Sequence, residues 1–133
     1  MKKLSLLLVV LIASALAATA SAHVFSATPS LTIHKSPTGT TASGAKILVY
    51  GRIVSRRSFC KSNRVVRLFR VRPGPDRFLG TDITDSEGEY VFFRHPRRDQ
   101  TVYTRIRARF FSTYGHTHSC ARARSRNLFI NVG

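Results

Sequence analysis

Apolar and polar residues alternate with a period of two in several segments after residue 22. This alternation places successive side chains on opposite faces of an extended strand, whereas an amphipathic helix repeats its apolar positions every three to four residues. None of these segments keeps a helical period. The pattern therefore predicts an all-β fold with seven strands, at residues 31–34, 46–54, 64–72, 77–83, 89–94, 101–111 and 126–132.

The alternation also predicts which side chains face the core. In segment 89–94, Tyr90 and Phe92 share one face. In segment 101–111, three arginines occupy one face and mark it as the solvent side, so the opposite face points inward; they are Arg105, Arg107 and Arg109. Seven short strands in a chain of this length are typical of an immunoglobulin-like β-sandwich.

A turn is predicted between segments 77–83 and 89–94, which would make them a hairpin. Asp85 can accept hydrogen bonds from backbone amides a few residues further on, as in an Asx turn. Gly88 can adopt the positive φ that such a turn needs. Thr84 precedes this turn, and Tyr90 follows it and is expected to enter the core.

The first 22 residues have the pattern of a secretory signal peptide. Lys2 and Lys3 precede an apolar run at 6–13, and the segment ends in Ala20-Ser21-Ala22. Cleavage after Ala22 would leave a single domain that starts at His23, with an N-terminal strand and a Ser/Thr/Pro/Gly-rich loop at 23–45 and the sandwich core at 46–133. An uncleaved membrane anchor is the alternative.

The net charge of the chain indicates which class of partner it can attract. Without Lys2 and Lys3 the chain has 20 basic and 6 acidic residues, a formal charge of +14. A field of that strength attracts polyanions. For an exported protein these are anionic cell-envelope polymers or lipids, and no intracellular nucleic acid is expected. The alternative is an arginine-rich codon usage with solvated side chains.

Cys60 and Cys120 are the two cysteines of the chain. In an exported protein two cysteines commonly form one disulfide. A loop of this length would stabilise the fold by about 4 kcal/mol on the chain-entropy estimate. Two free thiols or half of a metal site are the alternatives.

Several segments resemble the carboxypeptidase regulatory-like domains. They are Gly51-Arg52-Ile53, Cys60, residues 64–68, Leu79-Gly80-Thr81 and the TDSEGEY stretch at 84–90. The small exported bacterial forms, with a second cysteine near the last strand, are the most similar. This resemblance covers residues 46–132 and implies a transthyretin-like (prealbumin-like) β-sandwich. It further implies a non-catalytic module for adhesion, spacing or assembly.

Three groups of residues are candidates for binding. Two rows of arginines would form a basic grid if their strands pair, and arginine matches phosphate and carboxylate geometry; the rows are Arg105, Arg107 and Arg109, and Arg122, Arg124 and Arg126. His116 and His118 alternate on one side of an extended segment, where they could share one metal ion, although the segment is interpreted as a polar loop. A mature His23 would combine an amine and an imidazole, which together chelate Cu(II). A second imidazole would have to come from His34, His95, His116 or His118, if the fold brings one close.

The four acidic residues at positions 82, 85, 87 and 89 could supply the oxygen ligands that Ca²⁺ binds. Their spacing matches no EF-hand, and we expect them instead to compensate the charge of nearby arginines. Catalytic motifs are absent from the sequence. We therefore expect a secreted, non-catalytic module without a cofactor, with a structural, adhesive or anionic-envelope-binding role, or with another envelope protein as its partner. The alternative function is copper binding through His23.

Overall fold

The computed structural model describes residues 23–133, and the expected signal peptide with its cleavage site lies outside them. The described chain is built almost entirely from strands, which confirms the all-β prediction. It is divided into twelve strands rather than seven. They are β1 (His23–Ala27), β2 (Ser30–Leu31), β3 (His34–Ser36), β4 (Ile47–Val54), β5 (Val65–Arg70), β6 (Arg77–Ile83), β7 (Glu89–Arg94), β8 (Gln100–Ile106), β9 (Arg109–Thr113), β10 (His116–Cys120), β11 (Ala123–Arg124) and β12 (Leu128–Ile130), with one short helix, α1 (Ser58–Lys61).

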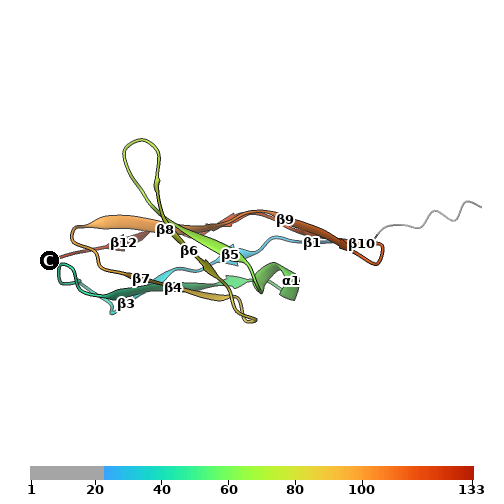
Figure 1. Cartoon of the computed structure of the whole chain (residues 1–133), viewed down its shortest axis with the longest axis horizontal. Coiled ribbons are helices and arrows are strands. Elements are labelled where there is room, and N and C mark those ends of the chain that lie inside the picture. Colours follow the sequence, from blue (N-terminus) through green and yellow to red (C-terminus); the bar gives the residue numbers. More distant parts are fainter. Residues whose placement is uncertain (1–22) are drawn as a thin grey trace, which may run out of the picture.

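Two sheets form the body of the molecule and face each other as layers (Figure 1). In the first sheet β5 lies between β6 and β8, and β8 also pairs with β11 and β12. In the second sheet β4 pairs with β7, β2 and β3. The loop between β5 and β6 projects away from both layers (Figure 1).

The core lies between the two sheets and consists of the residues that the alternation predicts to face inward. Tyr90 and Phe92 are buried, whereas Val91 and Phe93 are exposed. Val102, Thr104 and Ile106 of β8 are also buried, so the register predicted for this strand is confirmed. The remaining core side chains come mainly from β4, β5 and β12: Ile47, Val49, Ile53, Val66, Leu68, Leu128 and Ile130.

A three-stranded ribbon extends the molecule along its longest axis (Figure 1). In it β10 lies between β9, which is antiparallel to it, and β1, which is parallel to it. The single strand predicted at 101–111 is therefore wrong: β8 ends at Ile106, and a new strand starts at Arg109. The polar loop predicted around His116 and His118 is also wrong, because these residues form β10.

A disulfide and a buried arginine side chain are among the contacts that attach the ribbon to the body. A disulfide joins Cys60 of α1 to Cys120 of β10, with Cα atoms 5.5 Å apart, as the sequence predicts. Buried Arg64 donates one hydrogen bond to the Cys60 carbonyl (2.7 Å) and another to the Arg107 carbonyl (2.6 Å). The second hydrogen bond fixes the backbone at Arg107, between the end of β8 and the start of β9.

The hairpin predicted from β6 and β7 is also corrected, because β6 pairs with β5 in the first sheet and β7 pairs with β4 in the second. The turn between them therefore carries the chain from one layer to the other. At the edge of β7, Asp82 Oδ2 accepts the Val91 amide at 2.8 Å. A carboxylate thus replaces the carbonyl partner that a neighbouring strand would supply.

Across residues 23–133, no helix has both the length and the apolar character that a bilayer crossing requires.

Candidate functional site

Three arginines form a row across the outer surface of the first sheet. Arg105 of β8 lies opposite Arg67 of β5 on one side and opposite Arg124 of β11 on the other. Side chains directly opposite one another on neighbouring strands have Cβ atoms only about 5 Å apart, and like charges in such pairs are destabilising. Other contacts must therefore offset the electrostatic repulsion between these three arginines.

Aromatic rings supply part of that compensation. Phe69 and Tyr103 stack on each other, with ring centres 5.4 Å apart and planes at 14°. The guanidinium carbon of Arg105 lies 4.4 Å from the centre of the Phe69 ring, and that of Arg124 lies 3.6 Å from the centre of the Tyr103 ring. Arg67 lies between Phe69 and Phe78, at 5.2 and 4.9 Å from their ring centres. We call these six residues the arginine face.

The guanidinium groups also cover the rings. Phe69 and Tyr103 are 6% and 4% exposed although they are on the outer side of the sheet. A guanidinium that stacks on a ring uses its flat face, and its N–H groups at the edge stay available for a planar anion. Within residues 23–133, the guanidinium groups of Arg67 and Arg105 form no hydrogen bond, whereas that of Arg124 donates to the Ser125 carbonyl at 3.3 Å and to Asn127 Oδ1 at 3.0 Å. The donors of Arg67 and Arg105 are therefore the ones left for a ligand.

Two open hollows continue the arginine face toward the ribbon, and they share Arg107 and Ala108. One has a volume of about 520 Å³ and includes Arg64, Arg67 and Arg109 in its lining. The other has a volume of about 500 Å³ and is lined by Arg105, Arg107, Arg122 and Arg124 together with small apolar residues. No acidic side chain lines either hollow.

Acidic side chains line neither hollow, although one of them, Asp76, borders the arginine face. Among residues 23–133 the only ion pair joins Arg52 and Glu89, at 2.8 Å on the second sheet. Asp76 is at the margin of the arginine face, where its Oδ2 accepts the Tyr103 hydroxyl at 2.7 Å. That hydrogen bond, together with one from the Arg72 amide and the charges of Arg124 and Arg105, lowers the pKa of Asp76. Burial and the nearby Arg109 lower the pKa of Arg64.

The predicted arginine grid is present in part. Arg105, Arg107, Arg122 and Arg124 line one hollow, and Arg109 lies in the adjoining one. Arg126 does not join them, because its guanidinium donates to the Ile33 carbonyl at 3.1 Å. The sequence reasoning did not include Arg67. The spacing Arg67-x-Phe69 on one strand and Tyr103-x-Arg105 on another could have indicated it, since each pair shares one strand face.

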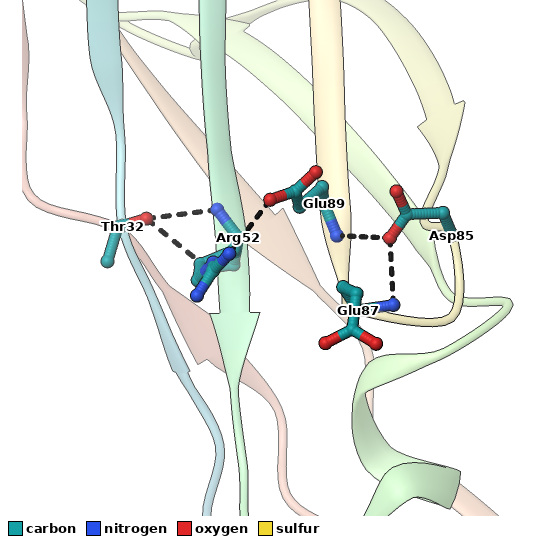
Figure 2. Close-up of polar contacts among 5 residues, drawn as sticks. All are labelled: Thr32, Arg52, Asp85, Glu87 and Glu89. Atoms are coloured by element: carbon teal, nitrogen blue, oxygen red, sulfur yellow. Dashed lines mark hydrogen bonds and ion pairs between the residues drawn. The ribbon is translucent and has the colours of Figure 1, made fainter.

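The polar residues of the TDSEGEY stretch at 84–90 have structural roles in this molecule. Asp85 Oδ1 accepts the amides of Glu87 and Glu89, each at 2.9 Å, which is the expected Asx turn (Figure 2). Thr84 Oγ1 accepts the Arg64 amide at 2.9 Å and donates to the Lys61 carbonyl at 2.6 Å. The hydroxyl of Tyr90 donates to the Thr32 carbonyl and also contacts Thr104 Oγ1 at 2.9 Å.

Three of the four acidic residues around this turn have polar partners for their side chains. Glu89 pairs with Arg52, whose amide is held by Thr32 (Figure 2). Asp82 and Asp85 accept backbone amides. Glu89 thus has the arginine partner expected for charge compensation, and Asp82 and Asp85 stabilise the turn and the edge of β7.

Three of the five histidines lie on one face of the ribbon. The parallel register of β1 and β10 places His23 opposite His116, with ring centres 5.6 Å apart. His118 lies in the next row, stacked between Phe25 and Phe111 and in edge contact with Phe59. Nδ1 of His116 and Nδ1 of His118 are buried and have no hydrogen-bond partner among the described residues.

Comparison with known proteins adds no relative: neither a protein-family model nor a curated protein matches the chain.

Proposed function

We propose that this protein is an exported, non-catalytic β-sandwich module whose arginine face binds anionic polymers of the cell envelope. The observation that carries the proposal is the cross-strand row of Arg67, Arg105 and Arg124, stacked on aromatic rings and continued by two hollows without acidic residues. The family assignment to the carboxypeptidase regulatory-like domains and the export of the chain are parts of this proposal. The Cys60–Cys120 disulfide supports the second part.

The energetic argument begins with the unfavourable pairing of like charges. Arg105 has an arginine directly opposite it on both neighbouring strands, and no carboxylate forms an ion pair with any member of the row within the described residues. Cation–π contacts of about 0.5–1 kcal/mol each at exposed sites offset part of this repulsion. A bound polyanion would neutralise the rest of the repulsion between the arginines. The row of arginines therefore destabilises the free protein, and the complex no longer has this repulsion.

The geometry favours an extended ligand with repeated charges. Neighbouring strands lie about 4.8 Å apart, so the three strands bring their cations within about 10 Å of one another. The hollows on both sides of Arg107 lengthen the same surface. A polymer with a phosphate or carboxylate on each unit can contact several guanidinium groups at once, which a single small anion cannot do.

The test is binding of poly(glycerol phosphate) and of polygalacturonate, measured by calorimetry at increasing salt. Between about 0.1 M and about 1 M salt the screening length falls from about 10 to about 3 Å, so binding should weaken strongly. A hydrogen bond to a charged group contributes about 1.5–3 kcal/mol, so Arg105→Gln with Arg124→Gln should weaken binding at least about tenfold.

The charge-matched control is Arg97→Gln with Arg98→Gln. These two exposed arginines lie in the loop between β7 and β8 and form no part of the arginine face. The control should keep most of the affinity. Equal losses in both double variants would show that only net charge matters and would contradict the proposed site. Binding only to phosphatidylglycerol vesicles, and to neither polymer, would replace the polymer by a lipid surface.

A further inference from the structure

We propose that His23 and His116 together hold one Cu(II) ion, with the α-amine of His23 as a third ligand after cleavage at Ala22. This site lies on the ribbon and is separate from the arginine face. It rests on the expected signal-peptide cleavage, and the first step of the test below decides that point.

The parallel register of β1 and β10 is the first support. Residues in register on neighbouring parallel strands project to the same side of the sheet. His23 and His116 are such a pair, although 92 residues separate them in the sequence. Antiparallel pairing or a shift by one residue would place the two imidazoles on different faces or in different rows.

The distance between the rings is the second support. An imidazole nitrogen binds a divalent metal ion at about 2.0 Å, and the ring centre lies roughly 1 Å beyond that nitrogen. Two imidazoles on one ion therefore have centres about 5–6 Å apart, depending on the angle between the bonds. The observed 5.6 Å between the centres of His23 and His116 falls in this range.

The state of His116 is the third support. Its Nδ1 is buried and has no hydrogen-bond partner in the described chain, so no hydrogen bond at this nitrogen opposes a rotation of the ring. His118 differs, because three phenylalanine rings enclose it. Of the two histidines on β10, only His116 has His23 opposite it.

Two imidazoles are too few ligands for a stable site. No group of three or more His, Cys, Asp or Glu side chains within residues 23–133 is arranged to hold a metal ion. A free α-amine on His23 supplies a third nitrogen and closes a six-membered chelate ring with the Nδ1 of the same residue. Three nitrogen ligands in a tetragonal arrangement suit Cu(II), which also binds nitrogen ligands more tightly than Zn(II) does.

The test starts with the chain exported from an expressing bacterium. Its mass and N-terminal sequence establish whether His23 is the first residue, and any other terminus overturns the proposal. Calorimetric titration with Cu(II) alone should then give a dissociation constant well below about 1 μM, and binding of Zn(II) should be weaker. Electron paramagnetic resonance should show nitrogen ligands on the copper. Binding at micromolar concentration or weaker overturns the proposal.

Variants assign the ligands. Loss of even an outer-shell partner costs about 10- to 100-fold in metal affinity, so His116→Gln should weaken binding at least that much. Insertion of Ser-Gly-Ser-Gly between Ala22 and His23 keeps both imidazoles but moves the α-amine away, and it should have a comparable effect. His34→Gln on β3 is the matched control and should bind like the unaltered protein. Unchanged affinity in His116→Gln, or an equal loss in His34→Gln, contradicts the site.

Discussion

The guanidinium carbon of Arg124 lies 3.6 Å from the centre of the Tyr103 ring, the shortest of the cation–π contacts in the described chain. Tyr103 is almost completely covered although it is on the outer side of the first sheet. The arginine side chain thus replaces the second layer that would otherwise bury this ring. A residue that carries charge for binding also protects an aromatic surface from water.

We predict that Arg124→Gln lowers the free energy of unfolding by about 0.5–1 kcal/mol, because a cation–π contact is lost and part of Tyr103 becomes exposed. Urea denaturation measures this value. In a double-mutant cycle with Tyr103→Leu, the coupling energy should have the same size. Arg122→Gln, a charge-matched change at a neighbouring exposed position, should have little effect. A coupling energy near zero would argue against the stacking.

We predict that removal of the disulfide by Cys60→Ser with Cys120→Ser lowers the free energy of unfolding by about 4 kcal/mol, because the unfolded chain regains the freedom of a loop of about 60 residues. Urea denaturation of this variant, and of the unaltered protein with and without reductant, should give the same ranking. A decrease of less than about 1 kcal/mol would contradict the prediction.

We predict that Gly88→Ala is more destabilising than Gly74→Ala. Both glycines have φ near +80°, at +82° and +84°. A Cβ on Gly88 would lie 2.7 Å from the Ile53 carbonyl oxygen, whereas a Cβ on Gly74 would meet no atom within 4 Å. The left-handed conformation costs an alanine roughly 1–2 kcal/mol at either site. The close contact should add at least about 1 kcal/mol at Gly88. Equal thermal unfolding temperatures for the two variants would contradict this.

We predict that stability falls between about pH 10 and about pH 12. Burial raises the pKa of Tyr90 to about 12, whereas an unfolded tyrosine titrates near 10. The folded state therefore keeps a proton that the unfolded state has lost. The contribution of this residue is fully present below about pH 10 and disappears as the pH rises through 12, a loss on the order of 2 kcal/mol.

Urea denaturation from pH 9 to pH 12 should show a smaller decrease in Tyr90→Phe than in the unaltered protein. Some decrease should remain, because burial and the hydrogen bond to Asp76 also raise the pKa of Tyr103. Identical pH dependence in the two proteins would contradict the assignment to Tyr90.

The sequence by itself determined the all-β character, the inward faces of the central strands, the disulfide and the Asx turn. Each of these features depends either on residues that are near one another in the sequence or on the chemistry of single residues. Alternation sets the faces of β7 and β8 whatever sheet they join, and Asp85 forms its turn with its own neighbours. The two cysteines of the chain have only each other as an intramolecular disulfide partner.

Only the tertiary structure decided which strands lie side by side. Period-two alternation is the same in either sheet, so it could not show that β6 and β7 belong to different layers. Just after the end of β8 at Ile106, the Arg107 carbonyl accepts a hydrogen bond from Arg64, which lies directly before β5 and 43 positions earlier in the sequence. Strand pairing between residues far apart in the sequence has no local signal, because the backbone hydrogen bonds that define it are the same for every residue type. That pairing placed Arg67 beside Arg105, and His23 beside His116.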